Sequence, residues 1–167
     1  MTTQAAEWIR DRVGQVADPE VPVLTIEDLG VLRDVRVDDE GRVVVVVTPT
    51  YSGCPAMDLI RTRISETLDD LGVTSYQVET VLAPAWTTGW MSEDGRRKLT
   101  EYGIAPPTGK RAAGGPVDVT LSVRRPVTCP RCGSADTTEL SRFASTACKS
   151  LWRCNACSEP FDHFKDI

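Results

Sequence analysis

Apolar residues recur at the 3.6-residue spacing of an amphipathic helix in two long stretches of the chain. The first covers residues 6–16 and stops at residues 18–22, because the two prolines there cannot continue a helix. The second covers residues 57–71 and ends before a glycine, a residue common just past helix C-termini. A shorter helix is predicted for residues 92–103, which begin with a serine and two acidic residues.

Alternating apolar and polar residues predict β-strands between these helices. Residues 35–47 indicate a hairpin that turns at residues 38–41. Its second arm, Val43–Val47, is five consecutive valines, which predicts an inner strand buried on both faces and covered by a helix on at least one side. Residues 76–82 alternate as a third strand. Residues 117–123 alternate as well, and that strand either extends the first sheet or leads into the C-terminal part of the chain.

The composition of residues 106–116 separates the chain into parts. This segment contains three prolines, three glycines and two basic residues, which is typical of a linker. We therefore predict an α+β protein with a helix-and-sheet domain at residues 1–105, a linker and strand at residues 106–125, and a small module at residues 126–167.

The charge of the chain narrows its partners. Its 167 residues carry a net charge of -5, which argues against nonspecific binding to nucleic acid and to an anionic membrane surface. No apolar run approaches the roughly 20 residues that cross a bilayer, and the first eight residues lack the features of a signal peptide. Six cysteines without an export signal favour a reducing compartment, so we expect a cytoplasmic location.

Two Cys-x-x-Cys pairs near the end of the chain carry the most specific chemistry. The four residues are Cys129, Cys132, Cys154 and Cys157. Their spacing lets four thiolates surround one ion tetrahedrally, which is the usual structural zinc site. A module of about 40 residues cannot bury enough surface to fold unaided, so metal binding would supply most of its folding free energy. We predict a zinc ribbon, although the same ligands could hold a single iron.

Paired cysteines also occur in redox motifs and in disulfides. Redox Cys-x-x-Cys motifs usually open a helix after a strand, and neither pair has that setting. Cys148 lies between the pairs, where a hairpin tip is expected. It is either a free thiol, or a substitute ligand or a contact to a partner's metal centre. His163, between two phenylalanines, fits a surface or packing role better than that of a fifth ligand.

Cys54 is the one cysteine outside the C-terminal module. It lies at the predicted start of the second helix, where the helix dipole would lower the pKa of a thiol. That makes it a candidate nucleophile or soft-metal ligand, and equally a small residue that fills a strand-to-helix junction. Asp18 and Glu20 could face Cys54 across the domain, or they could simply form a solvated turn. With no histidine before His163, a Cys-His dyad within the first domain is excluded, and no self-sufficient active site is visible.

Four segments carry a resemblance to known proteins. Residues 18–30 and 47–57 resemble the iron–sulfur cluster assembly family, a small α/β domain. Residues 145–154 and 159–165 extend the match to nearly the whole chain, which resembles the PaaD family of accessory proteins in bacterial phenylacetyl-CoA epoxidase systems. The chain has Ala144 where that family has a glycine, a small departure that alters the turn before Cys148.

The resemblance implies an accessory role in aerobic phenylacetate degradation. Epoxidation of the aromatic ring would belong to a di-iron oxygenase fed by a flavin and iron–sulfur reductase, and these components would be the partners. The PaaD protein would mature or insert their metal centres. By this resemblance Asp18 and Glu20 form the acidic turn and Cys54 is the helix-capping cysteine. Cys54, together with Cys148, would transiently hold iron or an iron–sulfur cluster, while the ribbon cysteines hold a structural Zn²⁺.

Other functions stay open at this point. A zinc ribbon that only bridges proteins would take up no iron. A nucleic-acid ribbon conflicts with the acidic chain, although six basic residues cluster around the paired cysteines: Arg124, Arg125, Arg131, Arg142, Lys149 and Arg153. A thiol oxidoreductase is a third alternative. The sequence also leaves open whether the chain forms a homo-oligomer.

Overall fold

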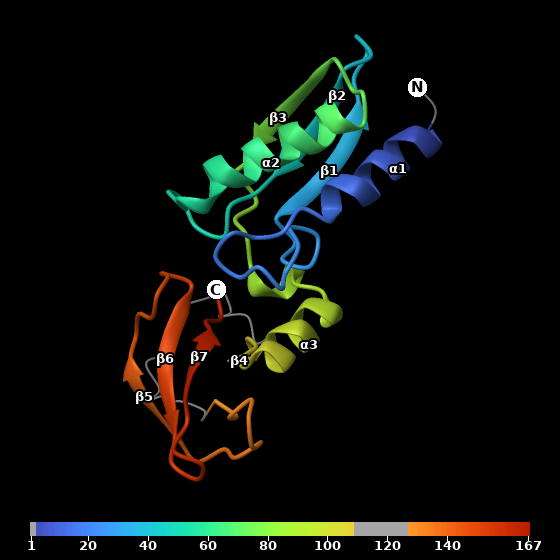
Figure 1. Cartoon of the computed structure of the whole chain (residues 1–167). Coiled ribbons are helices and arrows are strands. Elements are labelled where there is room, and N and C mark those ends of the chain that lie inside the picture. Colours follow the sequence, from blue (N-terminus) through green and yellow to red (C-terminus); the bar gives the residue numbers. More distant parts are fainter. Residues whose placement is uncertain (1–2, 109–126) are drawn as a thin grey trace. The chain divides into compact units, whose positions relative to one another are not determined.

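A computed structural model describes residues 3–108 and 127–167 of the chain. It divides into two compact units, Met1–Gly95 and Arg96–Ile167, each with its own sheet (Figure 1). This mixed helix-and-sheet architecture confirms the predicted α+β class. Within the part of the chain that the structure describes, no helix is long and apolar enough to cross a membrane.

The first unit contains the helices and strands predicted from the hydrophobic pattern. They are α1 (Thr3–Gly14), β1 (Leu32–Val37), β2 (Val43–Val47), α2 (Ala56–Asp70), β3 (Tyr76–Thr80) and the start of α3 (Glu93–Tyr102). A short 3-10 helix that was not predicted, η1 (Thr88–Trp90), precedes α3. The sheet order is β1-β2-β3, with β1 antiparallel and β3 parallel to β2. Helix α1 packs on β1 and on α2, and α2 packs on β3, so the two helices form one layer over the sheet (Figure 1).

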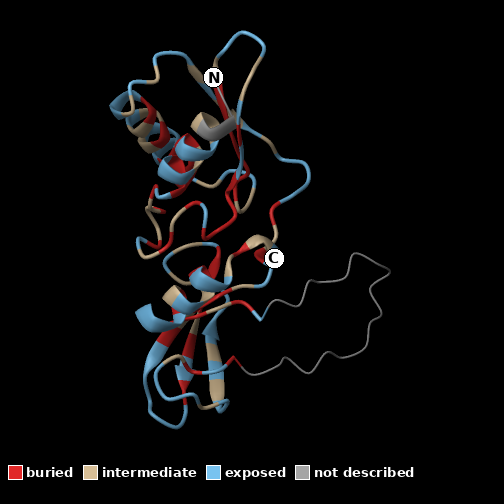
Figure 2. Ribbon diagram, turned by 90° about the vertical axis from the view of Figure 1, so that its right-hand side faces the viewer, coloured by how far each residue is buried: buried red, intermediate tan, exposed pale blue. Residues whose placement is uncertain are grey.

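The central strand β2 has the buried position that its valines predict. All five valines are buried (Figure 2). On the face opposite the helices, Arg36 pairs in register with Val44 and donates to Asp34 at 3.3 Å and to Glu79 at 3.1 Å. Asp34 and Glu79 both pair in register with Val46. The charged row therefore spans three strands, and the aliphatic stem of Arg36 helps to cover the two valines beneath it.

The second unit contains the rest of α3 and a four-stranded sheet. Its strands are β4 (Ile104–Ala105), β5 (Thr137–Ser141), β6 (Lys149–Cys154) and β7 (Pro160–Phe164), in the order β4-β7-β6-β5. Strands β5, β6 and β7 form an antiparallel meander, and β4 joins β7 in parallel. Its core contains two of the paired cysteines and consists of Ala105, Val127, Cys129, Trp152, Cys154 and Phe161.

The two compact units divide earlier than the domain boundary predicted from composition. The boundary predicted after residue 105 follows the prolines, whereas the units divide between Gly95 and Arg96. Pairing of β4 with β7 explains the difference, and Arg96 also donates to the Pro107 carbonyl at 2.8 Å. Most of the predicted linker and the whole strand predicted at residues 117–123 lie outside the described residues.

Candidate metal centre and the Cys54 turn

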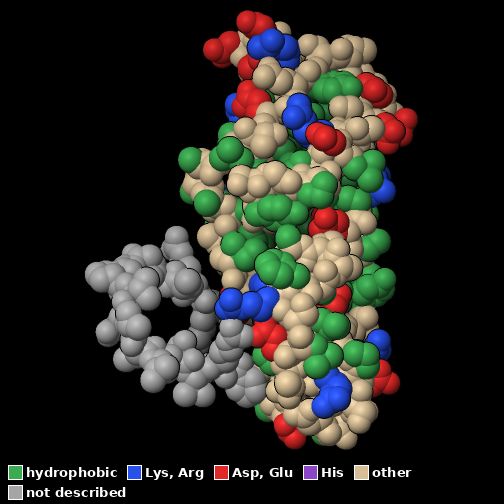
Figure 3. All heavy atoms as spheres, turned by 90° about the vertical axis from the view of Figure 1, so that its left-hand side faces the viewer, with side chains coloured by type: hydrophobic (Ala, Val, Ile, Leu, Met, Phe, Trp, Pro, Cys, Tyr) green, Lys and Arg blue, Asp and Glu red, His purple; other side chains and the backbone are tan. Residues whose placement is uncertain are grey.

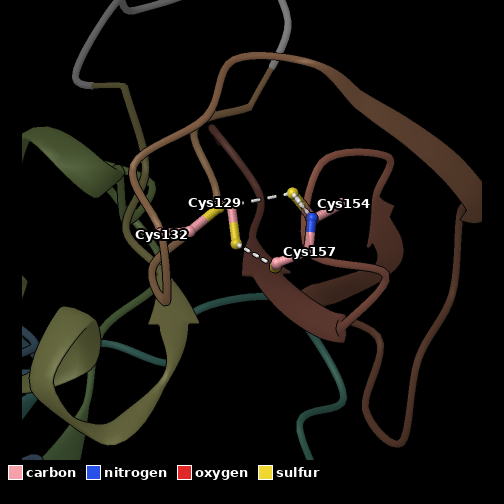
Figure 4. A group of neighbouring side chains, drawn as sticks. All are labelled: Cys129, Cys132, Cys154 and Cys157. Carbon is pink, nitrogen blue, oxygen red and sulfur yellow. Dashed lines mark hydrogen bonds between the residues drawn. The ribbon is translucent and has the colours of Figure 1, made fainter.

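The four ribbon cysteines meet at one end of the second sheet, and their sulfur atoms lie within 4.8 Å of one another (Figure 4). Cys129 and Cys132 precede β5, whereas Cys154 ends β6 and Cys157 lies in the turn to β7. The Sγ atoms of Cys129 and Cys157 are 3.8 Å apart, and those of Cys132 and Cys154 are 3.5 Å apart. The structure thus brings together the four ligands that the spacing predicts.

These distances fit a zinc ion. Four sulfurs at about 2.3 Å from a tetrahedral centre lie roughly 3.8 Å from one another. Among the described residues, this is the one group of three or more ligand-type side chains placed to hold an ion. An all-cysteine set with four members leaves no open coordination position, so the centre would hold the ribbon together rather than activate a substrate.

The two Cys-x-x-Cys turns share one backbone geometry. The N–H of Cys129 donates to the carbonyl of Ser134 at 2.9 Å, and the N–H of Cys154 donates to that of Glu159 at 2.9 Å, five residues on in both cases. The fourth residue after each first cysteine has a positive φ: 74° at Gly133 and 64° at Ser158. A glycine suits this conformation in the first turn, whereas sequence reasoning missed Ser158, although its equal offset from the first cysteine of its pair marks it.

This pair of turns gives a matched prediction. Gly133→Ala should weaken zinc binding about fivefold, because a Cβ in the left-handed region costs about 1 kcal/mol or somewhat more. Ser158→Gly should strengthen it by a similar factor, since it removes the same strain from the second turn. Competition with a chromophoric zinc chelator measures both affinities. Equal affinities for both variants and the unmodified chain would show that the turns bear no such strain.

Without a bound cation the clustered thiols compete for protons. The pKa of Cys154 falls to about 7, because its sulfur accepts the N–H of Cys157. The N–H of Glu159 lowers the pKa of Cys157, but burial and the sulfur of Cys154 outweigh it and raise that pKa to about 12. A cation would remove this conflict, so metal binding releases protons and weakens as the pH falls.

Cys54 lies in the turn between β2 and α2, directly before Pro55, the N-cap of the helix. Its side chain is half-buried. The sulfur accepts the N–H of Ala56 and a hydrogen bond from the hydroxyl of Thr50. The predicted place at the helix start is therefore correct to within one residue, and a helix N–H does reach the thiol.

The predicted lowering of the Cys54 pKa is wrong. Burial raises the pKa of this thiol above its ordinary value and is the largest influence on it. The Ala56 N–H and the Thr50 hydroxyl act in the opposite direction, but the carboxylates of Glu20 and Asp18 raise the pKa further. The contact expected at a helix start is present and is outweighed, so the thiol is protonated at neutral pH.

Asp18 and Glu20 lie in the turn after α1. Asp18 is buried, and its Oδ1 accepts two backbone N–H groups of its own turn at 2.9 and 2.7 Å. Arg63 of α2 donates to the Ala17 carbonyl at 2.9 Å, which ties the turn to the helix that follows Cys54. Both carboxylates lie near enough to raise the pKa of Cys54. The acidic turn and the cysteine are therefore neighbours, while Asp18 also caps its turn.

Cys148 occupies a different environment from Cys54. Its side chain is only 4% exposed, at the start of β6. The sulfur lies 3.1 Å from the Thr146 hydroxyl, and the backbone carbonyl accepts the N–H of Lys165 at 2.9 Å. A thiol buried in this way must be uncovered by movement of its loop before it can bind a metal ion or cluster.

His163 packs inside the ribbon. It is buried, and its ring meets that of Trp152 edge-on at 6.1 Å between centroids. The Trp152 Nε1–H donates to Ser150 Oγ at 2.9 Å, and Ser150 Oγ lies 3.4 Å from His163 Nδ1. The hydroxyl can therefore donate to Nδ1, which places the proton of the neutral ring on Nε2, a buried atom with no partner among the described residues.

The burial of His163 predicts an acid-sensitive ribbon. Burial lowers its pKa, against the carboxylates of Asp166 and Glu139, which raise it. Below the unfolded pKa of about 6.5, the unfolded chain takes up a proton that the folded chain refuses, so stability falls by up to roughly 1.4 kcal/mol per pH unit. His163→Gln should flatten this slope in urea unfolding of the zinc-loaded chain. If the free energy of unfolding falls equally steeply with pH in both proteins, protonation of the zinc-binding thiolates causes the acid sensitivity instead.

Comparison with known proteins finds a family match for each half of the chain. Residues 6–81 match the family described as iron–sulfur cluster assembly protein, and residues 113–165 match the PaaD zinc β-ribbon domain. A curated relative from Escherichia coli (strain K12), described as a candidate subunit of 1,2-phenylacetyl-CoA epoxidase, is 49% identical over 155 residues, which cover 93% of this chain and 89% of the relative.

Two further likenesses each cover more than half of the chain. An Fe-S protein maturation auxiliary factor from Porphyromonas gingivalis (strain ATCC BAA-308 / W83) is 33% identical over 97 residues, 58% of this chain and 91% of that protein. A crystal structure of a domain of unknown function, DUF59, from Bacillus anthracis is 26% identical with a TM-score of 0.50, over 59% of this chain and 97% of that one. The nearly full-length match to the Escherichia coli relative and the two domain matches together show that the chain belongs to the PaaD family, in which an iron–sulfur cluster assembly domain precedes a zinc β-ribbon.

Proposed function

We propose that the chain is an accessory subunit of a phenylacetyl-CoA epoxidase system that matures or inserts the metal centres of the oxygenase and reductase components. The cargo, iron or an iron–sulfur cluster, is held transiently by Cys54, and the nearby carboxylates of Asp18 and Glu20 attract it to the site. The observation that carries this proposal is a half-buried thiol whose pKa is raised beside two carboxylates. The names of the relatives, an epoxidase subunit and an iron–sulfur maturation factor, support it.

The charges around Cys54 favour a cation over other substrates. A catalytic nucleophile needs a lowered pKa, and burial and two carboxylates oppose this at Cys54. The same carboxylates attract a metal cation, and the cation in turn drives the thiol to ionise. The thiolate supplies a soft ligand suited to iron. We therefore assign Cys54 to metal binding rather than to nucleophilic catalysis.

The open ligand set at Cys54 suits transfer rather than storage. Within the described residues, Cys54 does not belong to a group of three or more ligand-type side chains placed to hold an ion. Cargo bound there would need further ligands from the client protein, so the complex that delivers the metal would also complete the site. Cys148 enters this path only if its loop opens, whereas the zinc ribbon serves as a structural clamp.

The alternative function is a zinc ribbon that bridges proteins without delivering metal. Two apolar side chains on the ribbon favour it: Leu140 is 52% exposed and Phe143 is 67% exposed, as expected of residues that a partner covers. Binding to nucleic acid gains no support. Lys149, one of the clustered basic residues, is buried and paired with Asp162 at 3.3 Å, and acidic and basic side chains are intermixed on the face drawn in Figure 3.

A transfer experiment separates delivery from bridging. The chain, purified anaerobically and loaded with ferrous iron or with a reconstituted cluster, is mixed with metal-depleted oxygenase or reductase in the presence of a chelator. Delivery predicts that the partner gains metal faster than from the same amount of free iron. Equal rates with and without the chain, together with a stable complex between the proteins, would instead establish the bridging function.

A further inference from the structure

Strand β3 leaves one backbone edge of the first sheet open. The Val43 N–H donates to the Ser75 carbonyl, and the Val81 N–H donates to the Val47 carbonyl, so odd-numbered residues of this segment bond to β2. The backbone groups of a strand alternate in direction, and those of Tyr76, Val78 and Thr80 therefore face away from β2. No other strand pairs with β3 among the described residues. An open edge of this kind can accept an added strand.

A groove runs beside this edge, between β3 and α2. Its volume is about 460 Å³, and it is lined by Asp58, Arg61, Thr62, Ser65, Tyr76 and Val78. The side chains of Tyr76 and Val78 belong to the same residues whose backbone groups face outward. A strand added to β3 would therefore point every second side chain into the groove, towards α2.

Arg61 gives the groove a chemical preference. Its guanidinium makes no hydrogen bond or ion pair with any of the described residues. This includes Asp58, which lies one turn earlier on α2. Ser65 and Tyr76, two residues with hydroxyl groups, line the same groove. Arginine pairs with carboxylates through two parallel hydrogen bonds, so the groove suits an extended segment that carries an acidic side chain.

We infer that the β3 edge and its groove bind an extended, acidic segment of a client protein by adding it as a fourth strand. The inference rests on the proposed function, because the client is the protein whose metal centre the chain matures. Main-chain hydrogen bonds to Tyr76, Val78 and Thr80 would supply affinity, and a carboxylate on Arg61 would supply selectivity. A client strand bound to β3 would lie on the same unit as Cys54.

A second copy of this chain fits the edge less well than an acidic client. Pairing two β3 strands about a two-fold axis would place both helices α2 on one side of the joined sheet. The two grooves would merge, and each would bring its Arg61 into the shared space. Each copy would also bring its Asp58, but this carboxylate makes no ion pair with Arg61 in the described structure, so the two guanidinium groups would repel each other, whereas a client carboxylate can pair with one.

The test uses overlapping peptides that tile the oxygenase and reductase components, titrated into the ¹⁵N-labelled full chain. At least one acidic peptide should bind, and it should slow the hydrogen exchange of the Tyr76, Val78 and Thr80 amides. The Gln77 and Glu79 amides, already bonded to β2, should be protected before and after. Binding with shifts that map elsewhere, or the failure of every peptide to bind, would overturn the inference.

Two variants and a matched control sharpen the result. Val78→Pro removes an outward N–H without touching the ladder to β2, a place where edge strands tolerate proline, and it should weaken binding by about tenfold or more. Arg61→Glu should do the same while keeping the backbone intact, whereas Arg12→Glu, with the same change of charge on exposed α1, should bind normally. Equal losses in both arginine variants would reduce the effect to net charge and contradict the inference.

Two outcomes keep this inference separate from the proposed function. Cys54→Ser should retain peptide binding, since Cys54 does not line the groove, so its metal transfer can fail while docking persists. Concentration-dependent self-association of the peptide-free chain that Val78→Pro abolishes would assign the edge to a second copy and overturn the client inference.

Discussion

Replacing Cys54 with serine should leave a folded, zinc-loaded chain that no longer supports metal insertion into its partners. Serine keeps the size and the hydrogen bonds with Ala56 and Thr50, but its hydroxyl does not ionise near neutral pH and is a poor ligand for iron. We expect the iron content of the oxygenase or reductase, co-produced with the variant, to fall by about tenfold or more, as for the loss of a metal ligand or its support. Metal analysis of the purified partners measures this.

Cys148→Ser is the matched control for that experiment, because it makes the same chemical change at a buried position. We expect normal partner metal content with this variant. A loss equal to that of Cys54→Ser would place Cys148 in the transfer path and require its loop to open. Full partner maturation by Cys54→Ser would remove the central residue of the proposed function and favour the bridging alternative.

Loss of the zinc centre should unfold the ribbon and spare the first unit. Cys154→Ser removes a fully buried ligand from the ribbon core. Zinc binding to ribbons of this kind contributes on the order of 10 kcal/mol, more than a small module can replace. The core of the first unit holds no ribbon ligand and includes the five valines of β2, Ile60, Ile64 and Leu68. Hydrogen-exchange mass spectrometry should show β5, β6 and β7 unprotected and β2 still protected.

Asn155→Ser, one residue away, controls for that variant. The Asn155 side chain is exposed and bonds the Asp136 carboxylate at 2.8 Å, outside the metal ligand set. It should keep one zinc per chain and a protected ribbon. If Cys154→Ser also keeps a protected ribbon, the sheet is stable without its metal, and the view of zinc as a structural clamp is wrong.

The elements of the first unit could be predicted because local pattern and burial agree there. Val43–Val47 has apolar side chains on both faces of the strand, and only an inner strand can bury both. The ribbon ligands could be predicted equally well, since tetrahedral coordination limits the spacing of paired cysteines. Which side chains cover Val44 and Val46 could not be predicted from the sequence, because Arg36 reaches Asp34 and Glu79 only in the assembled sheet.

The environment of Cys54 shows where sequence reasoning stops. Its place at a helix start follows from local sequence, and so does its contact with a helix N–H. The direction of its pKa does not, because it depends on burial in the folded domain and on two carboxylates from a turn more than 30 residues earlier in the chain. Summed effects of this kind depend on tertiary distances, and composition gives no measure of them.

The parallel pairing of β4 with β7 decides how the chain can be dissected. A ribbon fragment cut at the prolines of residues 106–107 would lose Ile104 and Ala105, one of them a member of the ribbon core. Strand β7 would then become a bare edge, the kind of surface on which isolated sheets aggregate. The poor solubility of such a fragment would report a missing neighbour strand rather than an unstable metal module, and fragments that begin at Arg96 avoid that confusion.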